Sequence, residues 1–384
     1  MLIKTNADEL QDYLSDASNL QDGHAEKLFI PETAAEIAEI LKEANEKKIP
    51  VTVSGARTGT VGGAIPFGGY LISLEKFNKI KEINREKLYA TVESGVSLID
   101  FQKAVEAENL FYPPDPTEWS CQIGGTIATN ASGARSFKYG ATRNFVRRLE
   151  IVLPTSDILN LRRGASFSDN GFIELETENG RKIKVKIPTY PQPNVRKNAS
   201  GYFSGEKTDA IDLFVGSEGT LGIITEIELA LLSKPESFFS AIVFFENETD
   251  LLNFVSEART ISFNSRAEKI RNPQSAIRNQ IDASLIEYFD EKALKFIGEK
   301  FPEVPGNAKG AIFFEQETTA ETEDVLLEEW NALLEKHRAD LETSWFTTTT
   351  QDREKMREFR HALPVAVNEK VVKNRQRKIG TDMA

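Results

Sequence analysis

The stretch SGARTGTVGG, residues 54–63, holds four glycines in ten residues and decides which fold this chain can adopt. A short apolar run, IPVTV, comes just before it, and a second strand-like run, GGYLISL, comes just after it. Glycine-rich loops of this kind often wrap a phosphate, because backbone without side chains can approach the anion closely. The stretch therefore predicts an anion-binding loop, and its spacing narrows the choice of design.

Two common phosphate-binding designs do not fit this loop. A Rossmann-type dinucleotide fold needs a strand, the pattern G-x-G-x-x-G and then a helix. Here the glycines fall at 55, 59, 62 and 63, and the run after them is typical of a strand. A Walker A loop needs Gly-Lys-Ser/Thr at the start of a helix, and no lysine follows these glycines. What remains is a loop between strands whose backbone N–H groups form an anion-binding nest.

The composition indicates an ordinary globular chain. Its 384 residues predict two domains or more, and the mix is 40% hydrophobic and 28% charged. A formal charge of −12 argues against nucleic acid and anionic lipid as general partners, although it allows a local basic pocket. The single cysteine, Cys121, excludes an internal disulfide and fits a reducing compartment. With only three histidines beside it, a cysteine-rich zinc site is excluded. No signal peptide or membrane-spanning run is predicted.

The hydrophobic pattern predicts alternating helices and strands. Residues 33–47 read as a helix, with Thr33 and Glu36 at capping-box spacing. Asn179-Gly180, between two alternating runs, predicts a hairpin. Beyond about residue 235 the order is strand, helix, a variable middle, strand and long helix, which predicts a sheet with helices on one face.

Three further glycine-rich stretches occur before residue 235: PPDPTEWSCQIGGTIATNASG (113–133), KYGATRNFV (138–146) and GSEGTLGIIT (216–225). Each stretch alone is equally consistent with a tight turn and with a ligand-binding loop. Four such stretches, rich in Ser, Thr and Asn, favour a ligand-binding site. Together they closely resemble the FAD-binding domain of the vanillyl-alcohol oxidase / p-cresol methylhydroxylase superfamily. Within it, the chain is similar to glycolate oxidase subunits, D-lactate dehydrogenases and D-2-hydroxyglutarate dehydrogenases. The resemblance is strong over residues 28–235 and weak over 236–384.

This resemblance implies an α+β fold. A two-subdomain FAD-binding domain would span residues 1–235, and a ferredoxin-like α+β substrate (cap) domain would span 236–384. The sequence stops at Ala384, before a His-rich stretch that the family uses for metal ligands or a base, so this cap would be C-terminally truncated. Accordingly no metal site is predicted in this chain, and activity would be impaired if nothing replaces the missing part.

The implied reaction moves a hydride from a small D-2-hydroxy acid, such as lactate, glycolate or 2-hydroxyglutarate, to FAD. Electrons would leave to a quinone, a cytochrome or an electron-transfer flavoprotein. Two alternatives stay open: a flavin-binding subunit or remnant with little activity alone, and a related FAD enzyme with another substrate. The protein would lie in the cytoplasm or at the periphery of the inner membrane, as a possible homodimer or with a partner subunit.

The family's motifs, carried over position by position, imply a large set of FAD-binding residues. These are Ser54, Gly55, Ala56, Arg57, Thr58, Gly59, Pro114, Asp115, Ser120, Gly124, Gly125, Asn130, Ser132, Gly133, Tyr139, Gly140, Glu218, Gly222 and Ile223. Some relatives attach the flavin covalently through a histidine in the first loop. SGARTG has no histidine or cysteine, so non-covalent FAD is expected, with Cys121 as a small wall residue.

Three residues are implied on the substrate side. Arg360, in MREFRHALPVAV, would clamp the substrate carboxylate, because a guanidinium can donate two parallel hydrogen bonds to it. Lys378, in RKIGTDMA, resembles a lysine near the same site. Asn198 lies in an Asn-x-x-Gly-Tyr segment that the family places beside the flavin. The alternative interpretation is that Arg360 and Lys378 are solvated basic residues and that the Asn198 segment is a polar turn.

Overall fold

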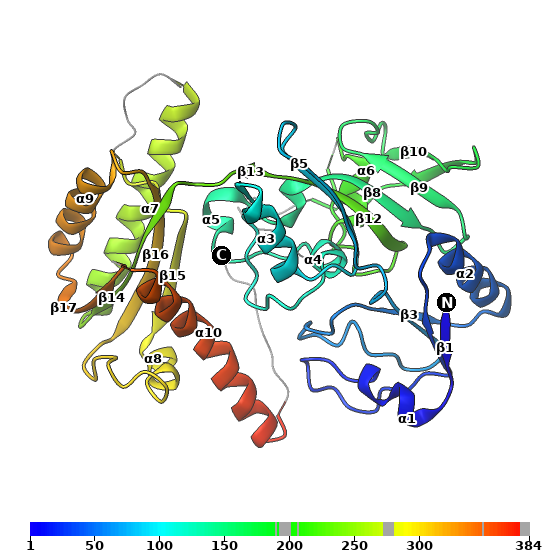
Figure 1. Ribbon diagram of the computed structural model, residues 1–384, viewed down its shortest axis with the longest axis horizontal. Coiled ribbons are helices and arrows are strands. Elements are labelled where there is room, and N and C mark those ends of the chain that lie inside the picture. Colours follow the sequence, from blue (N-terminus) through cyan, green and yellow to red (C-terminus); the bar gives the residue numbers. More distant parts are fainter. Residues whose placement is uncertain (189, 192–200, 206, 272–279, 348, 377–384) are drawn as a thin grey trace. The chain divides into compact units, whose positions relative to one another are not determined.

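The computed structural model describes residues 1–188, 190–191, 201–205, 207–271, 280–347 and 349–376 (Figure 1). The chain forms two compact units. The first contains residues 1–132 and 141–233. The second contains residues 133–140 and 234–375. A short segment from within the glycine-rich motifs therefore belongs to the second unit, which the sequence did not predict.

A mixed four-stranded sheet forms one half of the first unit, in the order β1-β2-β4-β3. Helix α2 covers it, burying Ile37, Ile40 and Leu41. The Thr33 side chain caps α2 by accepting from the backbone N–H of Glu36, and the Glu36 carboxylate accepts from the backbone N–H of Glu32. The elements are β1 (Leu2–Lys4), α1 (Ala7–Leu10), η1 (Gln11–Tyr13), β2 (Lys27–Ile30), α2 (Ala34–Lys47), β3 (Val51–Ser54) and β4 (Tyr70–Ser73).

An antiparallel five-stranded sheet, in the order β5-β6-β12-β8-β9, forms the other half. The predicted hairpin is confirmed: β10 pairs with β11, and Gly180 takes a φ of +80° in the turn. The strands are β5 (Ile80–Asn84), β6 (Tyr89–Glu93), β7 (Leu110–Phe111), β8 (Val146–Val152), β9 (Ile158–Arg162), β10 (Phe172–Glu176), β11 (Lys182–Lys186), β12 (Ile223–Ala230) and β13 (Leu232–Ser233). The helices are α3 (Leu98–Ala107), α4 (Ile123–Ala128), η2 (Thr142–Phe145) and α6 (Ala210–Phe214).

The second unit is an antiparallel sheet in the order β15-β16-β14-β17, with helices on both faces (Figure 1). Phe239, Ala241 and Val243 pack with α7 and α9, whereas Ile242 and Phe244 pack with α8 and α10. The expectation of helices on one face was wrong, because the central strands are apolar on both sides. The elements are β14 (Ser237–Phe245), α7 (Glu248–Arg271), β15 (Leu285–Asp290), α8 (Glu291–Ile297), β16 (Gly310–Thr318), α9 (Glu323–Lys336), β17 (Asp340–Phe346) and α10 (Thr350–Lys373).

Ion pairs anchor the segment 133–140, with its short helix α5 (Ser136–Tyr139), inside the second unit. Arg135 makes two hydrogen bonds to the Glu315 carboxylate, at 2.9 and 3.2 Å. Lys138 lies 3.4 Å from a carboxylate oxygen of Asp282, which is 3% exposed. Arg266 donates to Asp282 at 2.7 Å and to the Phe137 carbonyl at 2.8 Å. These contacts explain why a segment of the predicted cofactor motifs groups with the later part of the chain.

Replacing Asp282 with asparagine is expected to destabilise the second unit. Burial alone would raise the pKa of Asp282, but Lys138, Arg266 and Lys269 outweigh it and lower the pKa below its usual value. The stabilisation is therefore fully present above the unfolded pKa, near 4, and is lost as pH falls through the lower folded pKa. Asp282→Asn removes the buried carboxylate charge that Lys138, Arg266 and Lys269 share, and should cost about 3 kcal/mol of unfolding free energy at neutral pH.

Urea unfolding of wild type and Asp282→Asn at pH 7 and in acid measures this cost. The difference should shrink below pH 4, where the wild type loses the same contribution. Glu303→Gln is the control, because it removes an exposed partner of Lys355 in the same unit and should barely change stability. Equal stability of Asp282→Asn and wild type at pH 7 would contradict the anchoring role.

Candidate functional site

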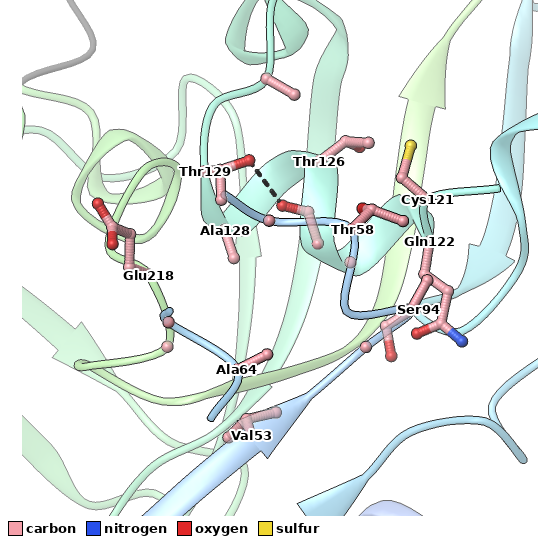
Figure 2. Close-up of a pocket in the computed structure, with 18 of the residues that line it drawn as sticks. Val53, Thr58, Ala64, Ser94, Cys121, Gln122, Thr126, Ala128, Thr129 and Glu218 are labelled. Atoms are coloured by element: carbon pink, nitrogen blue, oxygen red, sulfur yellow. Dashed lines mark hydrogen bonds between the residues drawn. The ribbon is translucent and has the colours of Figure 1, made fainter. Parts of the chain in front are cut away.

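A cavity of about 310 Å³ opens in the first unit, between its two halves (Figure 2). The crossover loop, residues 55–69 between β3 and β4, supplies one wall, and the region around α4 supplies the opposite one. The lining residues are Val53, Gly55, Ala56, Arg57, Thr58, Gly59, Val61, Gly63, Ala64, Leu74, Ser94, Pro116, Glu118, Cys121, Gln122, Gly124, Gly125, Thr126, Ala128, Thr129, Ala131, Ser217, Glu218, Gly219, Gly222, Ile223 and Ile224.

The crossover loop leaves its backbone donors unused. Its first part is tied to the N-terminal segment, where the Ala17 N–H donates to the Arg57 carbonyl at 3.2 Å. Its last part is held by His24, which exchanges backbone hydrogen bonds with Pro66 and Gly68. Within the part of the chain that the structure describes, no backbone N–H of residues 55–64 donates to a protein acceptor. A run of free N–H groups in a held loop is suited to binding an anion.

Ser94 supplies a buried hydroxyl to the same cavity. The residue is 1% exposed, and its Oγ has no hydrogen-bond partner among the described residues. Its backbone is fixed on both sides: its N–H donates to the Thr225 carbonyl at 3.0 Å, and its carbonyl accepts from Gly124 at 2.7 Å. An unpaired buried hydroxyl is costly unless a ligand satisfies it.

Glycines around the cavity fall into two kinds. A Cβ added to Gly124 would lie 2.6 Å from the Ser94 Cβ, so Gly124 allows two backbone segments to approach closely. A Cβ added to Gly59, Gly63 or Gly125 would meet no protein atom within 4 Å. These last three glycines line the cavity and leave their space to whatever occupies it.

The turn 216–219 closes one side of the cavity and is fixed by α4. The N–H groups of Gly216 and Glu218 donate to the carbonyls of Ile127 and Ala128, at 2.9 and 2.8 Å. These bonds fix the turn to carbonyls at the C-terminal end of α4, of which that of Ile127 also accepts from the Asn130 N–H at 3.0 Å. In Figure 2, Glu218 is drawn on one side of the view, and Ser94 and Gln122 are drawn on the other.

Arg143 stabilises this turn through its hydrogen bonds. Its guanidinium donates to the Asp212 carboxylate at 2.9 Å and to the Val215 carbonyl at 2.5 Å. Its backbone N–H donates to the Asn130 side chain at 3.1 Å. Burial lowers the pKa of Arg143, and Asp212 opposes that effect by stabilising the charge. Arg143, in the third glycine-rich stretch, therefore bonds Asn130 in the second stretch through its backbone and Val215, the residue just before the fourth stretch, through its side chain.

Cys121 is a buried wall residue, 8% exposed. Burial raises the pKa of its thiol to about 12, and Glu118 adds to the effect. Since the thiolate is the nucleophilic form, this thiol is unreactive near neutral pH.

The structure brings one part of the predicted FAD-binding set together at the cavity and leaves another part outside it. Those at the cavity are Gly55, Ala56, Arg57, Thr58, Gly59, Gly124, Gly125, Glu218, Gly222 and Ile223. Those that do not line it are Ser54, Pro114, Asp115, Ser120, Asn130, Ser132, Gly133, Tyr139 and Gly140. Of the latter, Gly133, Tyr139 and Gly140 belong to the second unit, where the Tyr139 hydroxyl donates to Glu317.

Sequence reasoning missed Ser94, Gln122 and Thr126. The available signal for Ser94 was Ser94-Gly95 at the end of the strand-like run LYATVES (88–94), which resembles Ser54-Gly55 at the end of β3. Gln122 is the N-cap position of α4 without a side-chain capping bond, and a Cβ on Gly55 would meet its Oε1 at 3.0 Å. No spacing rule pairs Gly55 with Gln122, because only the fold brings them together.

On the proposed substrate side, Arg360 lies on α10 in the second unit and is 6% exposed. Its Nε donates to the Glu287 carboxylate at 2.7 Å, so it already binds a carboxylate of the protein. Asn198 and Lys378 lie outside the described residues. In the described ranges, no group of three or more His, Cys, Asp or Glu side chains is placed to hold a metal ion.

The part of the chain that forms most of the cavity wall matches a known protein family. Residues 25–162 match the family model described as FAD binding domain. The first unit contains an FAD-binding domain. The match covers the crossover loop, Ser94 and α4, which together form most of the cavity wall. The cavity offers backbone N–H groups without acceptors, a Ser94 hydroxyl without a partner, and open space beside three of its glycines. These features fit a cofactor that carries a pyrophosphate and many polar groups.

Similar proteins include FAD-linked oxidoreductases. The chain is 41% identical over 223 residues to a D-lactate dehydrogenase of Anaerostipes hadrus, covering 58% of this chain and 39% of that one. It is 32% identical over 328 residues to glycolate oxidase subunit GlcD of Bacillus subtilis (strain 168), covering 84% and 58%. These relatives confirm the resemblance predicted from the motifs. The chain spans between 39% and 60% of the length of the first curated relatives it matches.

The fold also matches solved structures. The chain is similar to alkyldihydroxyacetonephosphate synthase, with a TM-score of 0.65 and 15% sequence identity over 95% of this chain and 66% of that one. At this identity the likeness speaks for the fold alone, and it confirms the predicted α+β architecture. No described helix is both long and apolar enough to span a membrane.

Alanine at the two neighbouring glycines of α4 should separate packing from cofactor binding. Gly124→Ala should lower the free energy of unfolding by about 1–3 kcal/mol, because the new methyl meets Ser94. Gly125→Ala should stabilise the FAD-free protein by about 0.5–1 kcal/mol, since alanine favours the helix and its methyl enters open space. It should nevertheless weaken FAD binding, because the methyl group enters cavity space that we expect the cofactor to fill.

Thermal unfolding without FAD and FAD titration by fluorescence quenching measure the two effects. Each variant is the control for the other, since both add one methyl group to the same helix turn. Wild-type FAD affinity in Gly125→Ala would show that the cofactor does not occupy this part of the cavity.

Proposed function

We propose that the protein oxidises a small D-2-hydroxy acid, such as lactate, glycolate or 2-hydroxyglutarate, by hydride transfer to FAD. The proposal is carried by the cavity: unused N–H groups and a buried hydroxyl line it within an FAD-binding domain. The names of the relatives, D-lactate dehydrogenase and glycolate oxidase subunit, support the choice of substrate class.

Within the first unit, each wall has a distinct task in this proposal. The backbone N–H groups of residues 55–59 bind the pyrophosphate. Ser94 and Gln122 hydrogen-bond polar atoms of the cofactor, while Leu74 and Ile223 give apolar surface that keeps water out. Bound FAD supplies the hydride acceptor for the reaction.

In the second unit, Arg360 remains the proposed clamp for the substrate carboxylate. Its contact with Glu287 supports the idea that its surroundings suit a carboxylate. Lys378 is proposed as a second cation for the substrate, and Asn198 as a residue beside the flavin. The two-domain division of labour, with FAD in residues 1–235 and a cap in 236–384, belongs to the same proposal.

Electrons would pass on to a quinone, a cytochrome or an electron-transfer flavoprotein. A cytoplasmic location, peripheral to the inner membrane if the acceptor is a quinone, is in keeping with the single cysteine. A second candidate function is a flavin-binding subunit with little activity alone. It requires only the FAD-binding cavity of the first unit and no substrate site in the second.

FAD is expected to be bound without a covalent link. Cys121, with its thiol pKa of about 12, does not present a thiolate at neutral pH, and the crossover loop offers no histidine or cysteine. Acid precipitation of the yellow protein should leave all flavin in the supernatant, in wild type and Cys121→Ser alike. Flavin that stays with the wild-type pellet but not with Cys121→Ser would show a cysteine link.

Anaerobic addition of D-lactate, glycolate or D-2-hydroxyglutarate should bleach the flavin absorbance of the purified holoprotein. L-lactate is the control and should leave the spectrum unchanged. Bleaching by one D-acid identifies the substrate. An oxidised spectrum with all of them would contradict a dehydrogenase acting alone and favour the flavin-binding subunit. Failure to bind FAD at all would contradict both functions.

A further inference from the structure

Arg57 is the one cationic side chain among the described residues that line the cavity. The carboxylates of Glu118 and Glu218 also line it, and the whole chain carries a formal charge of −12. The pyrophosphate of FAD is anionic, so it enters a site whose lining carboxylates outnumber its cations. In these surroundings a single guanidinium has a large influence on whether the anion is held.

The backbone of Arg57 is held in a conformation that favours glycine, with a φ of +58°. Such backbone is costly for a residue with a Cβ, and it persists where the surrounding structure imposes it. The position lies between Gly55 and Gly59, inside the run of unused N–H groups.

Tyr13 holds the Arg57 side chain. The guanidinium carbon lies 4.8 Å from the centre of the Tyr13 ring, within the range of a cation–π contact. The ring is itself fixed, because the Tyr13 hydroxyl donates to Glu75 at 2.9 Å. Burial and Glu75 raise the pKa of Tyr13 to about 12, so the ring stays neutral. Across the described ranges, no carboxylate lies within ion-pair distance of Arg57.

We infer that the Arg57 guanidinium, held over the Tyr13 ring, binds the pyrophosphate of FAD. The stacked face of the guanidinium is used by the ring, while its N–H edge stays available for phosphate oxygens. This inference rests on the FAD-binding part of the proposed function and is independent of the substrate. The competing explanation is that Arg57 only fastens the N-terminal segment to the loop.

Arg57→Gly separates the two explanations, because glycine adopts a φ of +58° without strain. If Arg57 binds the pyrophosphate, the variant should bind FAD about 10–100-fold more weakly, the usual loss for a charge-assisted hydrogen bond. Its FAD affinity should also depend less on salt than that of wild type, because an ionic contact is gone. Fluorescence titration with FAD at low and high salt measures both.

Lys48→Gly is the matched control. Lys48 also has a φ of +58°, at the exposed end of α2, and does not line the cavity. The variant removes the same charge and the same strain, so it should raise Tm slightly while leaving the Kd for FAD unchanged. Arg57→Lys keeps a cation and should retain part of the lost affinity. Tyr13→Phe keeps the ring but removes the hydrogen bond to Glu75 that fixes it, so it should weaken FAD binding less than Arg57→Gly does.

Riboflavin, which lacks the pyrophosphate, distinguishes the part of FAD involved. Arg57→Gly should leave riboflavin binding unchanged while FAD binding falls. An FAD affinity equal to that of wild type, or an equal loss for FAD and riboflavin, would overturn the inference while leaving the FAD-binding assignment intact. If wild type itself does not bind FAD, the proposed function and the inference fail together.

Discussion

The site depends on the parallel pairing of β3 with β4. Their register, from Val51 opposite Tyr70 to Ser54 opposite Ser73, forces the chain to return the full length of the strand before it can pair again. Parallel neighbours usually make this return through a helix, which would consume the backbone donors of the connection. Here a loop makes the return, and both of its ends are fixed by the sheet. The N–H groups in the middle of the loop are therefore available to a ligand, while the loop itself is held in place.

The opposite wall follows the same principle of fixing backbone so that polar groups face inward. Gly124 lets α4 approach Ser94 so closely that its N–H bonds the Ser94 carbonyl at 2.7 Å. The hydroxyl of Ser94 is thereby buried with no protein partner. Arg143 fixes the turn after Val215 in a similar way, by bonding carbonyls instead of the ligand. The polar groups for the cofactor are thus set in place before it binds, which lowers the entropy that binding must overcome.

Local rules predicted the parts of this fold that local chemistry decides. The crossover loop, the cap at Thr33 and the hairpin at Asn179-Gly180 follow from spacing within a few residues. The helices on both faces of β14 were missed, although SFFSAIVFF (237–245) is apolar at consecutive positions, which indicates burial on both sides. Ser94 and the anchoring of segment 133–140 could not be read in this way, because each depends on partners far along the chain. Asp282, for example, lies well over a hundred residues from Lys138.

Charge explains why rigidity matters so much here. An acidic chain that binds an anionic cofactor can use a cluster of lysines or the dipoles of its own backbone. This cavity has a single lining cation among its described residues, so most of the attraction must come from N–H dipoles. A dipole's field falls off faster with distance than that of a charge, so the loop must hold each N–H within hydrogen-bond reach of the phosphate. The sheet register that shapes the loop is therefore also what gives an acidic protein its affinity for an anion.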